Sequence, residues 1–137
     1  MPQNASPDWD ALRSRARGMT ERSYAPYSGV RVGAAALTSD GEVVTGCNVE
    51  NASTGIGICA EVTLATSMVA HGSGQKLVAM AVVAGDGDPI PPCGRCRQFL
   101  YEFGGDAMLI ETAEGIVTLG ELLPGAFGPG DVAGRSG

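Results

Sequence analysis

Three cysteines and one glutamate have the types and spacing of a catalytic metal site. Cys93 and Cys96 are three residues apart, so on a helix their directions differ by only about 60° and both can reach one metal ion. A structural zinc site closes with four Cys or His ligands, whereas a catalytic site keeps three and one open position. Among Cys47, Cys59 and His71, Cys59 is the better third ligand. It follows a Gly-containing loop at a predicted helix start, where the helix dipole favours a thiolate.

Glu61 follows Cys59 by two residues. In the middle of a helix that offset would turn the two side chains about 200° apart. They can share a site only if Cys59 caps the helix and Glu61 lies in its first turn. A carboxylate beside a water acidified by zinc can accept a proton and pass it to a leaving group. The implied chemistry is metal-assisted hydrolysis at an unsaturated carbon.

Other readings of these residues remain open at this point. A lone Cys-x-x-Cys pair could be a redox site. A structural zinc module that binds a partner would need a fourth ligand and would not require Glu61. Cys47 is typical of a small buried apolar residue, and His71 of a solvated partner of a helix C-terminus.

The rest of the sequence predicts an α/β fold that positions these residues. Helical spacing predicts a first helix from about Pro7 to Tyr24, with Ser6 as its N-cap. The further predicted helices are 58–71, closed by Gly72, one from near Cys93 to before Gly104, and a turn at 119–123. The predicted strands are 30–38, 42–46, 77–84 and 107–111, with a hairpin turn at 39–41 and a loop at 48–57. Alternating strands and helices predict a mixed sheet covered by helices, followed by an irregular Gly-rich tail from about residue 124.

Length and charge narrow the function further. The 137 residues fit one domain, taken as 1–137, and the net charge of −6 gives no electrostatic footprint for phosphates. A nucleic-acid polymer is therefore not expected as a partner. We also expect no membrane association, because the chain has no run of about 20 apolar residues, and its first residues do not resemble a signal peptide. The expected location is the cytoplasm, where the four cysteines would be ligands or buried residues rather than disulfides.

Three segments carry a resemblance to a known family. They are Asn48-Val49-Glu50-Asn51-Ala52-Ser53, Cys59-Ala60-Glu61 and Pro92-Cys93-Gly94-Arg95-Cys96-Arg97-Gln98. Together they resemble the small, all-cysteine, zinc-dependent cytidine deaminases. The resemblance covers nearly the whole chain, from 24–28 to 122–128. It implies a three-layer α/β/α fold with a five-stranded mixed sheet, one Zn²⁺ per chain, and a homotetramer with shared active sites.

The same resemblance implies the activity and the role of each site residue. Cytidine and deoxycytidine would be deaminated hydrolytically to uridine and deoxyuridine, with release of ammonia, in pyrimidine salvage. Glu61 would take a proton from the attacking water and deliver protons to ring nitrogen 3 and the departing amino group. The backbone N–H of Ala60 would bind the base carbonyl, and Asn48 and Glu50 would hold the ribose hydroxyls. Phe127 resembles the aromatic residue that a neighbouring subunit places against the substrate.

Several positions depart from the family pattern. Val30 stands where a Phe commonly packs against the base, and Thr54 where a Tyr is usual, so weaker packing on the base is expected. Val62 stands where many relatives carry an Arg. Three thiolates around zinc leave a net negative charge. Arg95 and Arg97 are the candidates to offset it, and the resemblance favours Arg95.

The nearest alternative is a deaminase of another cytosine nucleoside, such as blasticidin S. Those enzymes share an apolar residue after Cys-Ala-Glu and the segment Pro-Cys-Gly-Arg-Cys-Arg-Gln. The intact Asn48-Val49-Glu50-Asn51 segment and Phe127 favour an ordinary ribose. Editing of RNA or DNA is disfavoured by the acidic composition and by the lack of an aromatic and basic groove.

Overall fold

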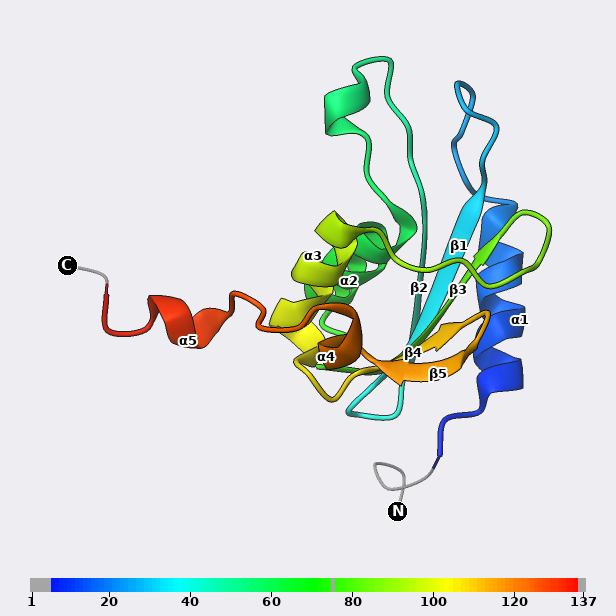
Figure 1. The fold of residues 1–137 in the computed structure, drawn as a ribbon. Helices are drawn as coiled ribbons and strands as arrows, with labels where there is room; N and C mark the ends of the chain where they lie inside the picture. Colours follow the sequence, from blue (N-terminus) through cyan, green and yellow to red (C-terminus); the bar gives the residue numbers. More distant parts are fainter. Residues whose placement is uncertain (1–5, 75, 136–137) are drawn as a thin grey trace.

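A computed structural model describes residues 6–74 and 76–135, and its centre is a five-stranded sheet (Figure 1). The strand order is β2 (Val43–Cys47), β1 (Val32–Thr38), β3 (Leu77–Ala84), β4 (Leu109–Thr112) and β5 (Gly115–Thr118). All neighbours are antiparallel except β3 and β4, which are parallel. The expected five-stranded mixed sheet is thus confirmed.

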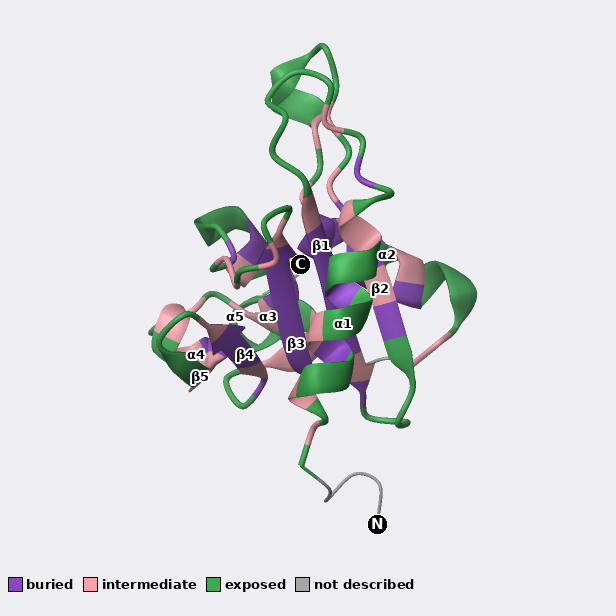
Figure 2. Cartoon of the chain, turned by 90° about the vertical axis from the view of Figure 1, so that its right-hand side faces the viewer, coloured by how far each residue is buried: buried purple, intermediate pink, exposed green. Residues whose placement is uncertain are grey.

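Helices cover both faces of this sheet. In Figure 1, α1 (Trp9–Thr20) lies on one side, and α2 (Ala60–His71) and α3 (Gly94–Gly104) lie on the other. Alternate strand residues pack in opposite directions, as the pleat requires. Ala35 and Val83 pack with Leu12 of α1, whereas Ala34 and Val82 belong to the core beneath α2 and α3. The buried strands lie between the helices in Figure 2, which confirms the three-layer α/β/α fold.

The first helix is shorter than its sequence pattern predicted. It begins at Trp9 rather than Pro7, because Asp8 and not Ser6 is the N-cap. The Asp8 carboxylate accepts a hydrogen bond from the Ala11 N–H at 3.1 Å. The helix also ends at Thr20, before Tyr24. No described helix is long and apolar enough to cross a membrane.

Apart from a 3₁₀ turn within the predicted loop 48–57, two short elements were not assigned from the sequence. Strand β5 pairs with β4 as the outer strand of the sheet, and its side chains are exposed or half-buried. Within the tail expected to be irregular lies a four-residue helix, α5 (Pro129–Val132), and the Asp131 carboxylate accepts the Gly128 N–H at 2.8 Å at its start. Between the sheet and this tail lies α4 (Leu119–Leu122).

The start of α2 is held close to the sheet at Gly46 of β2. A Cβ atom at this position would lie 2.5 Å from the Leu64 nitrogen and 2.6 Å from the Ala60 oxygen. Only a residue without a side chain permits this approach. The absence of a side chain at Gly46 therefore fixes how near the first turns of α2 lie to β2.

Two loops extend beyond the end of the sheet next to the start of α2, as Figure 1 shows. One leads from α1 to β1, and the other leads from β2 through the 3₁₀ turn η2 (Thr54–Ile56) to α2. The Tyr24 N–H donates to the Asn48 carbonyl at 3.1 Å, and the Glu50 N–H donates to the Tyr24 carbonyl at 2.8 Å. The two loops therefore form one paired wall.

Candidate metal-dependent active site

Two of the predicted ligands occupy the same local position on different helices. Cys59 is the N-cap of α2 and Cys93 is the N-cap of α3, each with extended backbone geometry and without a side-chain capping hydrogen bond. Their sulfur atoms are therefore free for another partner. Glu61 lies in the first turn of α2, as the two-residue spacing required.

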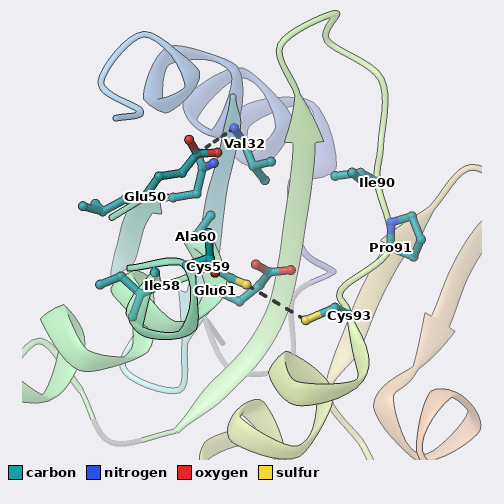
Figure 3. Close-up of a pocket in the computed structure, with 13 residues that line it drawn as sticks. Val32, Glu50, Ile58, Cys59, Ala60, Glu61, Ile90, Pro91 and Cys93 are labelled. Atoms are coloured by element: carbon teal, nitrogen blue, oxygen red, sulfur yellow. Dashed lines mark hydrogen bonds between the residues drawn. The ribbon is translucent and has the colours of Figure 1, made fainter. Parts of the chain in front are cut away.

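The sulfur atoms of Cys59, Cys93 and Cys96 all lie within 4.8 Å of one another. The Cys59 and Cys93 sulfurs are 4.0 Å apart, and Figure 3 shows them facing each other beside Glu61. Zinc–sulfur bonds of about 2.3 Å at tetrahedral angles place two sulfur ligands roughly 3.8 Å apart. The cluster thus fits a tetrahedral ion with three sulfur ligands, and the three cysteines are positioned to bind a metal ion.

Burial sets the protonation of these groups. It raises the pKa of the Cys59 and Cys96 thiols and of the Glu61 carboxyl. Burial also acts on Cys93, but hydrogen bonds from the Cys96 and Arg95 backbone and from the neighbouring thiols leave the pKa of Cys93 below its usual value. A bound cation deprotonates thiol ligands. The cluster therefore has the donor chemistry of a site that a soft divalent metal completes.

The cluster opens into a cavity of about 300 Å³. Its walls come from β1, from the loop 48–58 with the first turn of α2, and from the loop before α3, which contributes Ile90 and Pro91. Ala60 and Glu61 also line the cavity. The first N–H groups of a helix have no partner within the helix, so the start of α2 offers donors to a ligand here.

Asn48 and Glu50 line the same cavity, and neighbouring groups hold both side chains. The Asn48 amide oxygen accepts hydrogen bonds from the Val32 N–H at 2.9 Å and from the Ser23 hydroxyl. The Glu50 carboxylate accepts the N–H groups of Tyr27 and Ser28 at 3.0 and 3.1 Å. The Ser28 hydroxyl also donates to it, which lowers the pKa of Glu50.

Two predicted substrate contacts lie outside the lining of this cavity. Val30 is 52% exposed, and Val32, two residues later, lines the wall instead. Strand β1 begins only after Val30, because the Val30 carbonyl accepts the Asn48 side-chain N–H at 2.8 Å. Phe127 is 61% exposed beyond α4, and its carbonyl accepts the Gln98 side-chain N–H at 2.7 Å.

The two candidate arginines have different surroundings. Arg95 donates to the Gly57 carbonyl at 3.2 Å and so spans from α3 to the loop that ends at Cys59. Arg97 donates to the Pro92 carbonyl at 2.8 Å and to the Leu122 carbonyl at 2.9 Å, which ties α3 to α4. Val62 is buried in α2.

Comparison with known proteins identifies the family to which this site belongs. Residues 8–112 match the family described as "Cytidine and deoxycytidylate deaminase zinc-binding region". The chain belongs to this family. A cytidine deaminase of Mycobacterium tuberculosis is 49% identical over 125 residues, which cover 91% of this chain and 93% of that protein. A cytidine deaminase of Halalkalibacterium halodurans is 44% identical over 78% of this chain and 84% of that protein.

Solved structures agree with the sequence comparison. The crystal structure of the Mycobacterium tuberculosis cytidine deaminase matches with a TM-score of 0.87 and 49% identity, over 90% of this chain and 99% of that one. The Mycobacterium leprae enzyme matches with a TM-score of 0.85 and 47% identity, over 87% and 99%. Membership of the cytidine deaminase family identifies the metal as zinc, for which the sulfur cluster provides a fitting site.

The sequence did not predict every residue that lines the cavity. Val32, Ile90 and Pro91 line the cavity and were not predicted to do so. The Pro91-Pro92 pair directly before Cys93 was a usable signal, because consecutive prolines hold a loop extended. Cys47 is buried at the end of β2, where burial raises its pKa. His71 is exposed, with its ring 3.0 Å from the Ser67 carbonyl near the end of α2.

Proposed function

We propose that this protein deaminates cytidine and deoxycytidine hydrolytically, giving uridine and deoxyuridine with release of ammonia. One observation carries the proposal: Glu61, only 4% exposed, lies in the first turn of the helix whose N-cap belongs to the three-sulfur cluster, at the wall of the cavity. The names of the relatives, at up to 49% identity, support the same reaction. The role in pyrimidine salvage belongs to this proposal.

Cys59, Cys93 and Cys96 hold one zinc ion per chain in this proposal. Bound zinc acts as a Lewis acid that makes water a nucleophile at neutral pH. Glu61 accepts one proton from the attacking water and passes it to ring nitrogen 3 as the water oxygen bonds to carbon 4. The hydroxyl formed on carbon 4 then gives its proton to Glu61, which passes it to the amino group. The carbon–nitrogen bond breaks, ammonia leaves, and carbon 4 keeps a carbonyl oxygen. Burial raises the pKa of Glu61, which suits a group that must hold a proton between the two steps.

Groups on the cavity wall orient the nucleoside. The Ala60 N–H at the start of α2 binds the base carbonyl, and the side chains of Asn48 and Glu50 bind the ribose hydroxyls. All three residues line the cavity that the sulfur cluster opens into. Val30 lies outside the cavity lining, on the loop that Ser28 and Asn48 hold in place, so the proposal gives it only a loose contact with the base.

Arg95 offsets the negative charge of three thiolates around zinc. Its hydrogen bond to Gly57 holds the guanidinium across the loop that leads to Cys59, whereas Arg97 donates to the Pro92 carbonyl and to the Leu122 carbonyl of α4. Arg95→Ala should reduce turnover more than Arg95→Lys, which keeps the charge. Equal losses in the two variants would assign Arg95 a purely structural contact.

The chain acts as a single 1–137 hydrolase domain in a homotetramer with shared active sites, located in the cytoplasm. Exposed apolar side chains support the assembly: Tyr27 and Ile56 lie on the paired loops, and Phe127 and Val132 on the C-terminal segment. The end of this segment extends away from the sheet in Figure 1, and the exposed side chain of Phe127 is available to a neighbouring chain. The four free cysteines fit a reducing compartment.

Steady-state assays of the purified protein test the function. Cytidine and deoxycytidine should be consumed, as followed by loss of cytosine absorbance with release of ammonia. Glu61→Gln should keep zinc and fold yet lose at least about 100-fold in turnover, since an amide cannot carry the proton. Glu114→Gln, in an exposed turn, is the matched control. Near-normal turnover of Glu61→Gln would refute the mechanism, and preferential turnover of blasticidin S would favour the alternative substrate.

A further inference from the structure

We propose that Ser23 is a positioning residue for substrate binding: its buried hydroxyl holds the Asn48 side-chain amide in the orientation that presents one N–H donor to the sugar. The inference rests on the proposed function, because it concerns how the nucleoside is recognised. Ser23 follows α1 and is 7% exposed. It does not line the cavity, whereas Asn48 does, so Ser23 would act only through Asn48.

The paired loops bring these two residues together. The Tyr24 N–H donates to the Asn48 carbonyl at 3.1 Å, and the Glu50 N–H donates back to the Tyr24 carbonyl at 2.8 Å. This pairing fixes the chain directly before Tyr24 beside Asn48. The Ser23 hydroxyl then donates to the Asn48 amide oxygen. A contact across 25 residues is thus set by the backbone and completed by one hydroxyl group.

The hydrogen bonds of the Asn48 amide allow only one orientation. Its oxygen accepts from the Val32 N–H at 2.9 Å and from Ser23, which occupies both lone pairs. Its nitrogen donates one proton to the Val30 carbonyl at 2.8 Å. A flipped amide would set two N–H donors against each other at Val32 and two oxygens against each other at Val30. The second N–H of the nitrogen is the group left for a ligand.

This arrangement determines what Asn48 can recognise. With both lone pairs filled, the amide offers a donor and no acceptor, so it suits a sugar oxygen that accepts a hydrogen bond. The backbone groups of Val32 and Val30 determine on which side the amide oxygen and the amide nitrogen lie. The Ser23 hydroxyl holds the oxygen from a third direction. Restricting the side chain before binding reduces the ordering cost when the substrate arrives. Without the hydroxyl, the oxygen has a free lone pair and the amide can tilt.

A pair of nearly isosteric variants isolates the hydroxyl group. Ser23→Thr keeps it, and Ser23→Val replaces it with a methyl group of similar size. We expect Ser23→Val to raise the KM for cytidine by about fivefold while kcat stays nearly unchanged, the size expected for one hydrogen bond. Ser23→Thr should stay close to the parent protein. Neither variant should alter binding of 2′,3′-dideoxycytidine, as substrate or competitive inhibitor, because that nucleoside lacks the ring hydroxyls.

Equal losses for cytidine and dideoxycytidine in Ser23→Val would overturn the proposal, because they would indicate a general structural defect. If both variants are impaired by their bulk, Ser23→Ala decides, and it should show the same loss for cytidine alone. The side-chain amide signals of Asn48 in NMR spectra give a readout that needs no activity. They should shift or broaden in Ser23→Ala and Ser23→Val. A parent protein that turns over no cytidine would refute the proposed function, while unchanged Asn48 signals would refute the role of Ser23.

Discussion

Gly46 of β2 lies where the backbone of α2 contacts the strand. In Gly46→Ala the new Cβ atom would lie 2.5 Å from the Leu64 nitrogen and 2.6 Å from the Ala60 oxygen. Both are backbone atoms, so no side-chain rotation can relieve the overlap. Ordinary contact distances of about 3.5 Å require α2 to move away by roughly 1 Å. Overpacking of this kind costs typically about 1–3 kcal/mol of folding free energy.

The same movement reaches the reaction site. Ala60 is the residue between Cys59 and Glu61, so a shift of its carbonyl carries the N-cap and the first turn of α2 with it. A misplacement of about 1 Å in a catalytic constellation can reduce the rate by about 100-fold. Gly46→Ala should therefore lose both stability and kcat/KM. The addition of one methyl group would thus act on Glu61, a side chain that it does not touch.

The measurements are urea unfolding followed by circular dichroism, kcat/KM with cytidine, and zinc content. Gly18→Ala in α1 is the matched control, because a Cβ there meets nothing within 4 Å. As a helix-interior exchange it should raise stability by about 0.5–1 kcal/mol without changing turnover. Wild-type stability and turnover in Gly46→Ala would refute the reasoning, since the close approach of α2 would then have no mechanical consequence.

The sulfur cluster, the Arg13–Glu111 ion pair and the loop at Val30 can each be tested by one substitution. Cys59→Ala should reduce the zinc content below about one ion per chain. Cys47 is buried outside the cluster, so Cys47→Ala should retain the zinc. Full zinc content in Cys59→Ala would remove Cys59 from the ligand set. Arg13→Ala should lower the free energy of unfolding in urea by about 1–3 kcal/mol, because it leaves the buried Glu111 carboxylate without its ion pair; the 24% exposure of Arg13 moderates the loss. Adding Glu111→Gln should recover part of the lost stability. No recovery would contradict the ion-pair explanation. Val30→Phe should lower the KM for cytidine by up to roughly tenfold at similar kcat, and an unchanged KM would place Val30 outside the substrate site.

The predictable part of the site was local. Cys59 and Cys93 were placed at helix starts from the loops before them and from the two-residue spacing to Glu61, and the structure has both as N-caps. A strand with a continuous apolar run could also be predicted from the sequence. Strand β3 spans residues 77–84, which match the predicted range. In each case the signal lies within about ten residues of the chain.

The missed features depend on partners far away in sequence. Strand β5 has four exposed or half-buried residues and becomes a strand only by pairing with β4. Arg13 pairs with Glu111 across 98 residues, with 3.1 Å between its Nε and a carboxylate oxygen. In each case the residues near one partner in the sequence do not indicate which distant residues it will contact. The start of β1 was misplaced for the same reason, because the Asn48 side chain takes the Val30 carbonyl from 18 residues away.

The two helix starts show how the site and the fold depend on each other. Side chains that cap helices, such as Ser or Asp, contribute about 1 kcal/mol when they satisfy a free N–H group. Cys59 and Cys93 occupy both N-cap positions and make no such bond, so α2 and α3 begin without that contribution. The free N–H groups and the positive ends of both helix dipoles are instead available to thiolates and to a ligand. The missing capping bonds lower the local stability of both helices. They also leave the two thiols free to bind one metal ion from two separate helices. A zinc ion held by these cysteines would link α2 to α3, and the helix start that carries Cys59 also places Glu61 at the wall of the cavity.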